Sequence, residues 1–244
     1  ERNRPRWRSE DRLPGWVGAI CLASLAFFLR RWHLGTPHQF SFDETYYAKD
    51  AWSLLHFGYV RSYVEGADKL IIGGQTTGVW KDDPSMIGHP EIGKWLIALG
   101  ENAFGMDAFG WRVSAAVVGS LMVLVMCRFA RRITGSTALG LVAGLLLSFD
   151  GMQLVLSRLA LLDIFVAFFM LLGVHLVVMD RDWFRRRMAR RLAGRDEVGR
   201  IGPVRAMLFR PWLVLAGISF GLAVGTKWDA AYPLAAFGLL VWLW

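Results

Sequence analysis

Apolar stretches recur along this chain and are separated by polar segments. A helix needs about 20 apolar residues to cross the hydrocarbon core of a bilayer. Six stretches approach that length: residues 16–32, 111–129, 137–149, 159–179 and 212–226, and one that starts at Ala230. We therefore expect an all-α integral membrane protein, a multi-span helical bundle in which residues 16–32 form the first span and residues 111–244 hold spans two to six.

The positions of Lys and Arg predict the orientation of these spans. Arginines gather in three places: before the first span, just after the second span, and between residues 180 and 210, where there are ten. If the spans alternate in direction, all three groups lie on one side, which should be cytoplasmic. The basic tail 1–15 and the basic link 180–210 are then cytoplasmic, and the loop 33–110 faces outward. That loop holds ten acidic and five basic residues, the opposite balance.

The outer loop contains two stretches with helical periodicity. Residues 45–57 place Tyr47, Ala51, Leu54 and Leu55 on one face, and Gly58 is a suitable terminator. Residues 90–104 place Ile92, Trp95, Leu96 and Leu99 on one face, and Pro90 suits a first helical position. Both patterns predict amphipathic helices that lie in the membrane interface. The glycine-rich residues 73–78 between them predict a flexible connector.

Composition excludes several classes of protein. With 55% hydrophobic residues and twelve Trp, the chain is too apolar for a soluble domain of its length. A net charge of +8 could indicate nucleic acid, but the charge is grouped beside apolar spans, so no nucleic-acid partner is expected. Cys21 and Cys127 both fall within spans, which argues against a disulfide framework or a zinc site. The chain begins without Met and ends within an apolar run, so we expect a piece of a longer protein.

The acidic doublet Asp43-Glu44 is the first candidate for chemistry. Adjacent helical residues point about 100° apart, so one carboxylate should be reactive and the other should support it. A carboxylate at a partly dry interface can act as a general base toward a hydroxyl, or it can bind a cation. The alternative is a solvated helix start, where acidic residues favour the positive end of the helix dipole.

The segment from His89 to Lys94 supplies a second cluster of titratable groups on the same loop. Taken singly, His89 could be a surface imidazole and Lys94 a snorkelling side chain. Beside the acidic doublet, however, a basic group suits an anionic substrate that carries phosphate.

Further ionisable residues are expected at the outer ends of the spans. Arg30, Arg112 and Lys227 all fall on the outer side in the predicted topology, either as helix anchors or as ligands of an anion. Arg158 and Asp163 stand where the fourth span begins. An ionisable group within an apolar run indicates function, and the alternative is a structural pair between these two residues.

Several of these segments together resemble the protein O-mannosyltransferases. The resemblance rests on residues 29–34 and 42–44, on His89-Pro90-Glu91-Ile92-Gly93-Lys94, on Leu161-Leu162-Asp163 and on Gly225-Thr226-Lys227-Trp228, in order along the chain. At Glu91-Ile92 the family usually has proline and leucine, a departure that concerns the contacts with the acceptor.

The resemblance implies a GT-C glycosyltransferase fold, of which this chain is the N-terminal half. It also implies transfer of mannose from a polyprenyl-phosphate carrier to Ser or Thr of an exported protein, with inversion at the anomeric carbon. Asp43 would be the general base, and Glu44 would orient the first loop or the acceptor. Other residues would bind the substrates: Arg112, Lys227 and Arg158 the lipid phosphate, His89 the sugar or acceptor, with Lys94 and Asp163 beside them and Arg30 as a structural partner of the doublet.

The implied setting is a bacterial plasma membrane of actinobacterial type, with the active site on the extracytoplasmic face. The expected partners are the polyprenyl-phosphate mannose donor, the exported acceptor, membrane lipids and the protein translocation machinery. No organic cofactor is expected, although the doublet and a histidine could hold a divalent cation, Mg²⁺ or Mn²⁺.

Three rival functions stay open at this point. A sibling GT-C enzyme could transfer another sugar, or could transfer to a lipid. A transporter could use Asp163 along its pathway, but it predicts broken helices and inverted repeats, which the sequence does not display. A non-catalytic assembly subunit would bind the lipid carrier and transfer nothing.

Overall fold

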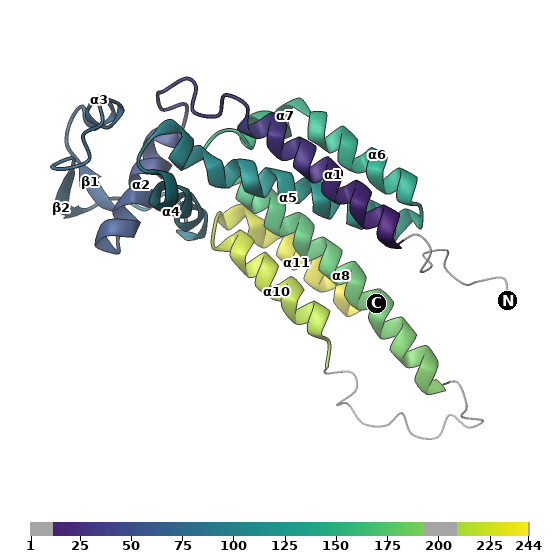
Figure 1. Cartoon of the computed structure of the whole chain (residues 1–244). Coiled ribbons are helices and arrows are strands. Elements are labelled where there is room, and N and C mark those ends of the chain that lie inside the picture. The colour runs from purple at the N-terminus through teal and green to yellow at the C-terminus, as the bar shows by residue number, and fades with distance from the viewer. Residues whose placement is uncertain (1–11, 193–208, 244) are drawn as a thin grey trace.

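The computed structural model describes residues 12–192 and 209–243, and most of them are helical (Figure 1). The elements follow in the order α1 (Arg12–Arg31), α2 (Glu44–Phe57), β1 (Arg61–Tyr63), α3 (Ala67–Ile72), β2 (Trp80–Pro84), α4 (Ile92–Phe104), α5 (Ala108–Thr134), α6 (Thr137–Phe149), α7 (Gly151–Leu156), α8 (Leu162–Leu192), α10 (Pro211–Val224), the 3₁₀ turn η2 (Trp228–Ala230) and α11 (Ala231–Leu243).

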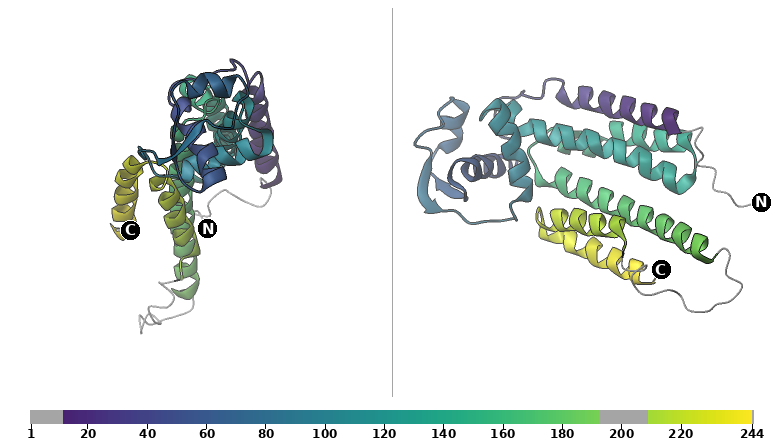
Figure 2. Two further views of the ribbon diagram at one scale, coloured as in Figure 1. Left: turned by 90° about the vertical axis from the view of Figure 1, so that its left-hand side faces the viewer. Right: turned by 60° about the horizontal axis from the view of Figure 1, so that its bottom comes forward.

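The long helices run alongside one another, and the outer loop is gathered beyond one end of them (Figures 1 and 2). Helices α1, α5 and α6 contact one another, and α8 joins them to α10 through α5. Among the described residues, three helices contain stretches long and apolar enough to cross a membrane: Leu13–Arg31, Ala108–Thr134 and Leu162–Ala189. Helices α6, α10 and α11 are apolar but shorter. The predicted helical membrane fold is confirmed.

The helix ends differ from the predicted spans where polar residues continue the helix. α5 begins at Ala108, where Asp107 caps it by accepting a hydrogen bond from Gly110 N at 2.7 Å. α8 runs to Leu192, well into the segment expected to be a cytoplasmic link. The arginines at the end of α5 and along the last turns of α8 lie at the end of the bundle away from the outer loop. The rest of that link and the tail up to residue 11 fall outside the described residues.

Both helices expected in the outer loop are present, α2 and α4. α2 ends at Gly58, whose φ of 79° is readily available only to glycine, as the sequence predicts. On α4, however, Trp95 and Leu99 are exposed, and the buried residues include Gly93, Lys94 and Glu101. The face with the large apolar residues Trp95 and Leu99 is thus left open, as a helix in the membrane interface requires, and the opposite face packs against the protein.

The stretch between α2 and α4 has structure that the sequence pattern did not indicate. β1 and β2 form an antiparallel pair with Arg61 opposite Pro84 and Tyr63 opposite Trp80, and α3 lies between them in the chain. Within the predicted connector 73–78, Gly74 and Gly78 have φ values of 85° and 71°, which explains why glycines stand there.

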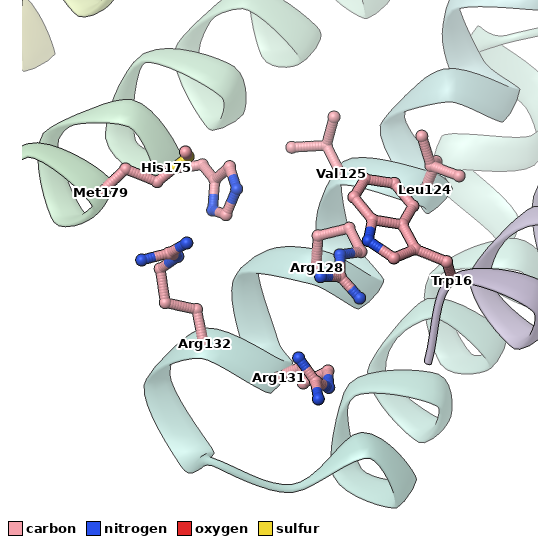
Figure 3. A pocket seen from close by; sticks show the side chains of 8 residues that line it. All are labelled: Trp16, Leu124, Val125, Arg128, Arg131, Arg132, His175 and Met179. Carbon is pink, nitrogen blue, oxygen red and sulfur yellow. The ribbon is translucent and has the colours of Figure 1, made fainter. Parts of the chain in front are cut away.

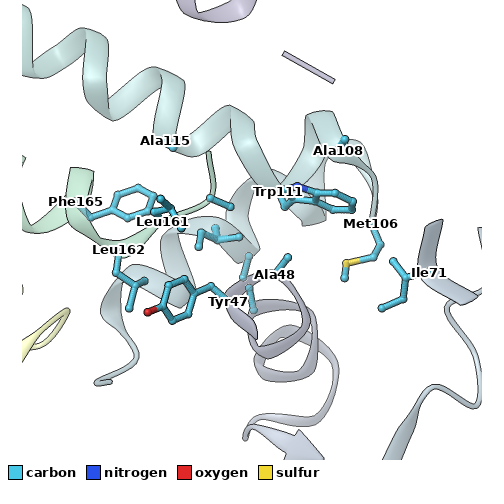
Figure 4. Close-up of a cluster of buried hydrophobic side chains, with 14 of the residues drawn as sticks. Tyr47, Ala48, Ile71, Met106, Ala108, Trp111, Ala115, Leu161, Leu162 and Phe165 are labelled. Carbon is cyan, nitrogen blue, oxygen red and sulfur yellow. The ribbon is translucent and has the colours of Figure 1, made fainter. Parts of the chain in front are cut away.

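The main core joins the outer loop to the bundle (Figure 4). Trp111 of α5 is fully buried and stacks on Phe40 of the loop, with ring centroids 4.6 Å apart. Tyr47 of α2 and Phe165 of α8 belong to the same cluster. Because one cluster holds side chains from α2, α4, α5 and α8, the outer loop is fixed on the ends of the long helices.

Glu101 on the buried face of α4 gives a stability prediction. Neither of its carboxylate oxygens has a hydrogen-bond partner among the described residues, and burial raises the pKa of Glu101 well above its ordinary 4.5. The folded form then keeps a proton that the unfolded chain releases, so this group makes stability fall as pH rises above the unfolded pKa. We expect Glu101→Gln to melt higher than wild type at about pH 8, with a difference that shrinks toward about pH 5.

The matched control is Glu65→Gln, which changes an exposed glutamate of the same loop. Melting temperatures of the three proteins in one detergent, recorded across this pH range, check the prediction. A Glu101→Gln curve parallel to that of wild type would contradict it.

Candidate active site

A cavity of about 350 Å³ opens in the outer loop, beyond the ends of the long helices. Four parts of the chain contribute to it: the start of α2, β1, the loop before α4 and the first turn of α4. Its lining residues are mainly polar or aromatic: Asp43, Tyr46, Tyr47, Asp50, Tyr63, Ser85, Met86, Gly88, His89 and Lys94.

Helix α2 presents three of these side chains along one face. Asp43, Tyr47 and Asp50 are spaced four and three residues apart, so they follow one another on the same side of the helix. Asp43 is the N-cap residue but makes no side-chain capping bond, and it is exposed. The Tyr47 hydroxyl donates to Asp43 Oδ2 at 3.4 Å. Burial and the charge of Asp43 raise the pKa of Tyr47, which therefore stays a donor.

Lys94 and Asp50, which both line this cavity, form an ion pair. Lys94 Nζ lies 2.8 Å from Asp50 Oδ2, and the Lys94 side chain is 1% exposed. Burial raises the pKa of Asp50, while the neighbouring Lys94 and Lys49 act in the opposite direction. The pair brings one charge of each sign to the cavity and links α4 to α2.

His89 lines the cavity from the loop before α4. Its Nδ1 is buried and has no hydrogen-bond partner among the described residues, and its ring centroid is 6.3 Å from that of Tyr47. A buried polar atom without a partner costs free energy unless something else satisfies it. This nitrogen is therefore available to a bound molecule.

Glu44, the neighbour of Asp43, faces the protein interior. Its carboxylate receives two hydrogen bonds from Arg112, Nε to Oε1 at 2.8 Å and Nη2 to Oε2 at 2.7 Å, and it is fully buried. Backbone N–H groups of Ser41 and Ala160 also donate to it, each at 2.9 Å. The doublet therefore points one carboxylate toward the cavity and the other into the core.

Arg112 uses all its donors within the protein. Besides the two bonds to Glu44, it donates to the carbonyl oxygens of Leu34, Pro37 and Gln39 at 2.8–3.1 Å. These five bonds match the five N–H groups of a guanidinium. Arg112 was expected to bind a lipid phosphate, but in this arrangement it holds the loop after α1 and the start of α2.

Arg30 does not pair with the acidic doublet, and that expectation is corrected. It is fully buried, donates from Nη1 to the carbonyl of Ala26 at 2.9 Å, and donates from Nη2 to Gln153 Oε1. Gly119 lies beside the guanidinium, where a larger residue would intrude. Arg158 donates to the carbonyls of Leu29 and Trp32 at the end of α1. Neither arginine lines the cavity.

Asp163 pairs with Lys227 rather than with Arg158. Their side chains meet at 2.8 Å, and they join the start of α8 to the turn after α10. Ile92 N donates to the carbonyl of Gly225 at 3.0 Å, which ties α4 to the same turn. Lys94 of the cavity lies in the first turn of α4, so this bond joins the turn that holds Lys227 to the helix that lines the cavity, although neither Asp163 nor Lys227 lines it.

A cation site made by the doublet and a histidine is not formed in this arrangement. Both oxygens of Glu44 are engaged by Arg112, and within residues 12–192 and 209–243 no group of three or more His, Cys, Asp or Glu is placed to hold a metal ion.

Asp50 and Tyr47 line the cavity and were not expected to be site residues. Their spacing from Asp43 was a usable signal, since positions i, i+4 and i+7 share one helical face. The apolar residues of α2 alone do not reveal this polar stripe, because Asp43 and Asp50 add nothing to a hydrophobic pattern.

Comparison with known proteins gives the family. The family model described as dolichyl-phosphate-mannose-protein mannosyltransferase matches residues 20–194, well over half of the chain. The chain belongs to this mannosyltransferase family. The predicted GT-C membrane fold and the resemblance to this family are thereby confirmed.

Several similar proteins with curated names are actinobacterial. A polyprenol-phosphate-mannose–protein mannosyltransferase of Mycolicibacterium smegmatis is 38% identical over 94% of this chain. Proteins with the same name from Mycobacterium tuberculosis and Corynebacterium glutamicum are 38% identical over 94% of the chain and 34% identical over 84%. The aligned part covers 42%, 41% and 36% of these relatives, so the chain spans about two fifths of their length.

The Glu44–Arg112 pair gives the second prediction. Glu44→Ala leaves the Arg112 charge buried without its partner, which typically costs about 3–5 kcal/mol. We expect a large fall in the melting temperature of the full-length protein in detergent. Glu65→Ala, which removes an exposed glutamate from the same loop, should change stability by less than about 0.5 kcal/mol. Equal melting temperatures for the two variants would show that the pair does not hold the loop.

Proposed function

We propose that the full-length protein transfers mannose from polyprenyl-phosphate mannose to Ser or Thr hydroxyls of exported proteins, at the cavity of the outer loop. The observation that carries this proposal is the placement of Asp43. Its carboxylate is exposed at the cavity, beside the ends of the membrane helices, while the adjacent Glu44 is buried. The family and the names of the relatives support the sugar, the carrier and the protein acceptor.

Asp43 is the general base in this proposal. Its carboxylate takes the proton of the acceptor hydroxyl while the hydroxyl oxygen attacks the anomeric carbon of mannose. The bond between that carbon and the phosphate oxygen breaks, and its electron pair leaves with the polyprenyl phosphate. Attack from the face opposite the phosphate inverts the anomeric configuration. Tyr47 donates to Asp43 Oδ2 and so helps to hold the carboxylate in place.

Lys227 is the proposed contact for the leaving phosphate. A cation there offsets the negative charge that develops as the carbon–oxygen bond breaks. Asp163 pairs with Lys227 at 2.8 Å and positions its ammonium group, while the Lys227 side chain keeps 18% of its surface exposed. Arg112 does not serve this role in the proposal, because its N–H groups are engaged by Glu44 and by the loop carbonyls.

His89 and Lys94 complete the proposed substrate site. The buried Nδ1 of His89 is suited to a hydrogen bond with a sugar or acceptor hydroxyl. Lys94 orders Asp50, whose carboxylate can accept hydrogen bonds from hydroxyl groups of the sugar. Arg158 and Arg30 do not contact the substrates in this proposal. Arg158 donates to carbonyls at the end of α1, and Arg30 donates to Gln153.

The proposed setting is the extracytoplasmic face of a plasma membrane. The acidic balance of the outer loop and the arginines at the opposite end of the bundle support that orientation. Acceptors would then be met as they leave the translocation machinery. A divalent cation stays a prediction, and transfer measured before and after chelation tests it.

Asp43→Asn gives the third prediction. The amide cannot take the hydroxyl proton, so transfer of labelled mannose to a Ser/Thr-rich peptide should fall by about 10²–10⁴-fold in membranes that hold the full-length protein. Asp83→Asn, which changes an exposed aspartate of the same loop, should keep wild-type transfer. Undiminished transfer by Asp43→Asn at normal membrane insertion would overturn the assignment of the base.

A further inference from the structure

A second polar cavity lies at the end of the bundle away from the proposed active site. Its volume is about 230 Å³, and it opens between the start of α1, the last turns of α5 and the middle of α8. Three arginines of α5 line it, Arg128, Arg131 and Arg132, together with Trp16 of α1 and His175 of α8. Figure 3 shows Arg128 beside the Trp16 ring, and His175 and Arg132 directed toward the space between α5 and α8.

Two buried polar atoms of this cavity lack a hydrogen-bond partner among the described residues. They are Nη1 of Arg128 and Nδ1 of His175. The Arg128 guanidinium is held over the Trp16 ring, with its carbon 4.0 Å from the ring centroid. Leaving such a charged donor buried and unmatched is costly, so the site is incomplete without an acceptor.

The other two arginines are fixed in position and add positive charge. Arg131 Nε donates to Thr137 Oγ1 at 2.7 Å, and Arg132 Nη1 donates to Asp182 Oδ2 at 3.0 Å. The three guanidinium groups bring positive charge to the cavity. Guanidinium groups bind phosphate oxygens through charge-assisted hydrogen bonds, so the fitting ligand is a phosphate group.

An apolar groove continues from this cavity along α1 and α5. Its volume is about 530 Å³, and Leu124 lines both the groove and the cavity. On α1, the lining residues Ile20, Ala23 and Phe27 continue the side that begins at Trp16, at helical spacing. On α5, Val117 and Leu121 continue the side that ends at Arg128. The groove therefore follows the membrane helices away from the basic cavity.

The ordinary explanation for arginines at this end is that they anchor helices at the lipid head groups. Arg185 fits that explanation, because it is exposed on the surface of α8. Arg128 does not fit it, since its Nη1 is buried and its guanidinium carbon lies over the Trp16 ring. An anchor also needs no cavity and no adjoining groove.

We propose that this cavity and groove bind one anionic glycerophospholipid of the surrounding membrane. Its phosphate accepts hydrogen bonds from Arg128 and His175, and one acyl chain lies in the groove between α1 and α5. Charge complementarity selects the head group, and the apolar groove that adjoins the basic cavity at Leu124 selects a lipid over a free anion. The site is separate from the mannosyl-transfer cavity and does not rest on that proposed function.

The test uses full-length protein freed of lipid in a non-ionic detergent. Melting temperature is recorded while phosphatidylglycerol, phosphatidylcholine, glycerol phosphate or inorganic phosphate is added. We expect a saturable rise with phosphatidylglycerol that the other three additions do not reproduce. An equal rise with inorganic phosphate would show an anion site with no lipid, and an equal rise with phosphatidylcholine would show that the basic cavity selects nothing. Either result overturns the proposal.

Two variants with matched controls locate the site. Arg128→Gln should weaken the apparent affinity for phosphatidylglycerol about tenfold, whereas Arg185→Gln, with the same change of charge, should leave it unaltered. Ala23→Trp fills the groove without changing charge and should also weaken it, whereas Val142→Trp on the exposed face of α6 should not.

The groove variant keeps the test decisive if Arg128→Gln does not fold. Unaltered affinity in Ala23→Trp, together with a lower melting temperature, would show that another part of the full-length protein covers the groove. That result would overturn the lipid assignment.

Discussion

The buried ion pair between Glu44 and Arg112 holds the outer loop to the membrane helices. It joins residues that lie 68 positions apart, and its two parallel hydrogen bonds fix the orientation of the Arg112 guanidinium and its distance from the Glu44 carboxylate. Three loop carbonyls and the backbone N–H groups of Ser41 and Ala160 complete it. The loop after α1, the start of α2, the start of α5 and the loop before α8 therefore meet at one point. A charge pair withdrawn from water is stable only with such complete satisfaction. For that reason we regard it as the constraint on which the rest of the site depends.

The position of Asp43 follows from this constraint. Because the Glu44 side chain is buried in the core, the side chain of the adjacent Asp43 must point in another direction. Asp43 lines the cavity. Tyr47 and Asp50 then follow along the same face of α2. Two further ion pairs link neighbouring elements. Lys94 with Asp50 joins α4 to α2, and Lys227 with Asp163 joins α8 to the turn after α10. The charges near the cavity are thus held by helices that are themselves packed together.

The sequence predicted the membrane helices and the place of the site better than the partners within it. Hydropathy and the arginine clusters identified the long helices, because each helix that crosses a membrane needs its own run of about 20 apolar residues. Asp43 and His89, which the sequence marked as candidates, both line the cavity. Adjacent residues of a helix point in different directions, which predicts that Asp43 and Glu44 face different surroundings. The partners of Arg30 and Arg112 could not be predicted, since Gln153 and Glu44 come near them only through helix packing. The face by which α4 packs on the protein could not be read from apolar residues alone, since it includes Gly93, Gly100 and the charged Lys94 and Glu101.

The claim that Asp43 acts on the acceptor hydroxyl, and not on the donor, is the centre of this account. Equilibrium binding of polyprenyl-phosphate mannose to full-length wild type and to Asp43→Asn tests it most directly. The account predicts the same donor Kd for both proteins, because the carboxylate contributes to proton removal and Lys227 contributes to holding the phosphate. A donor Kd that rises strongly in Asp43→Asn would contradict it and would make Asp43 a donor-binding residue.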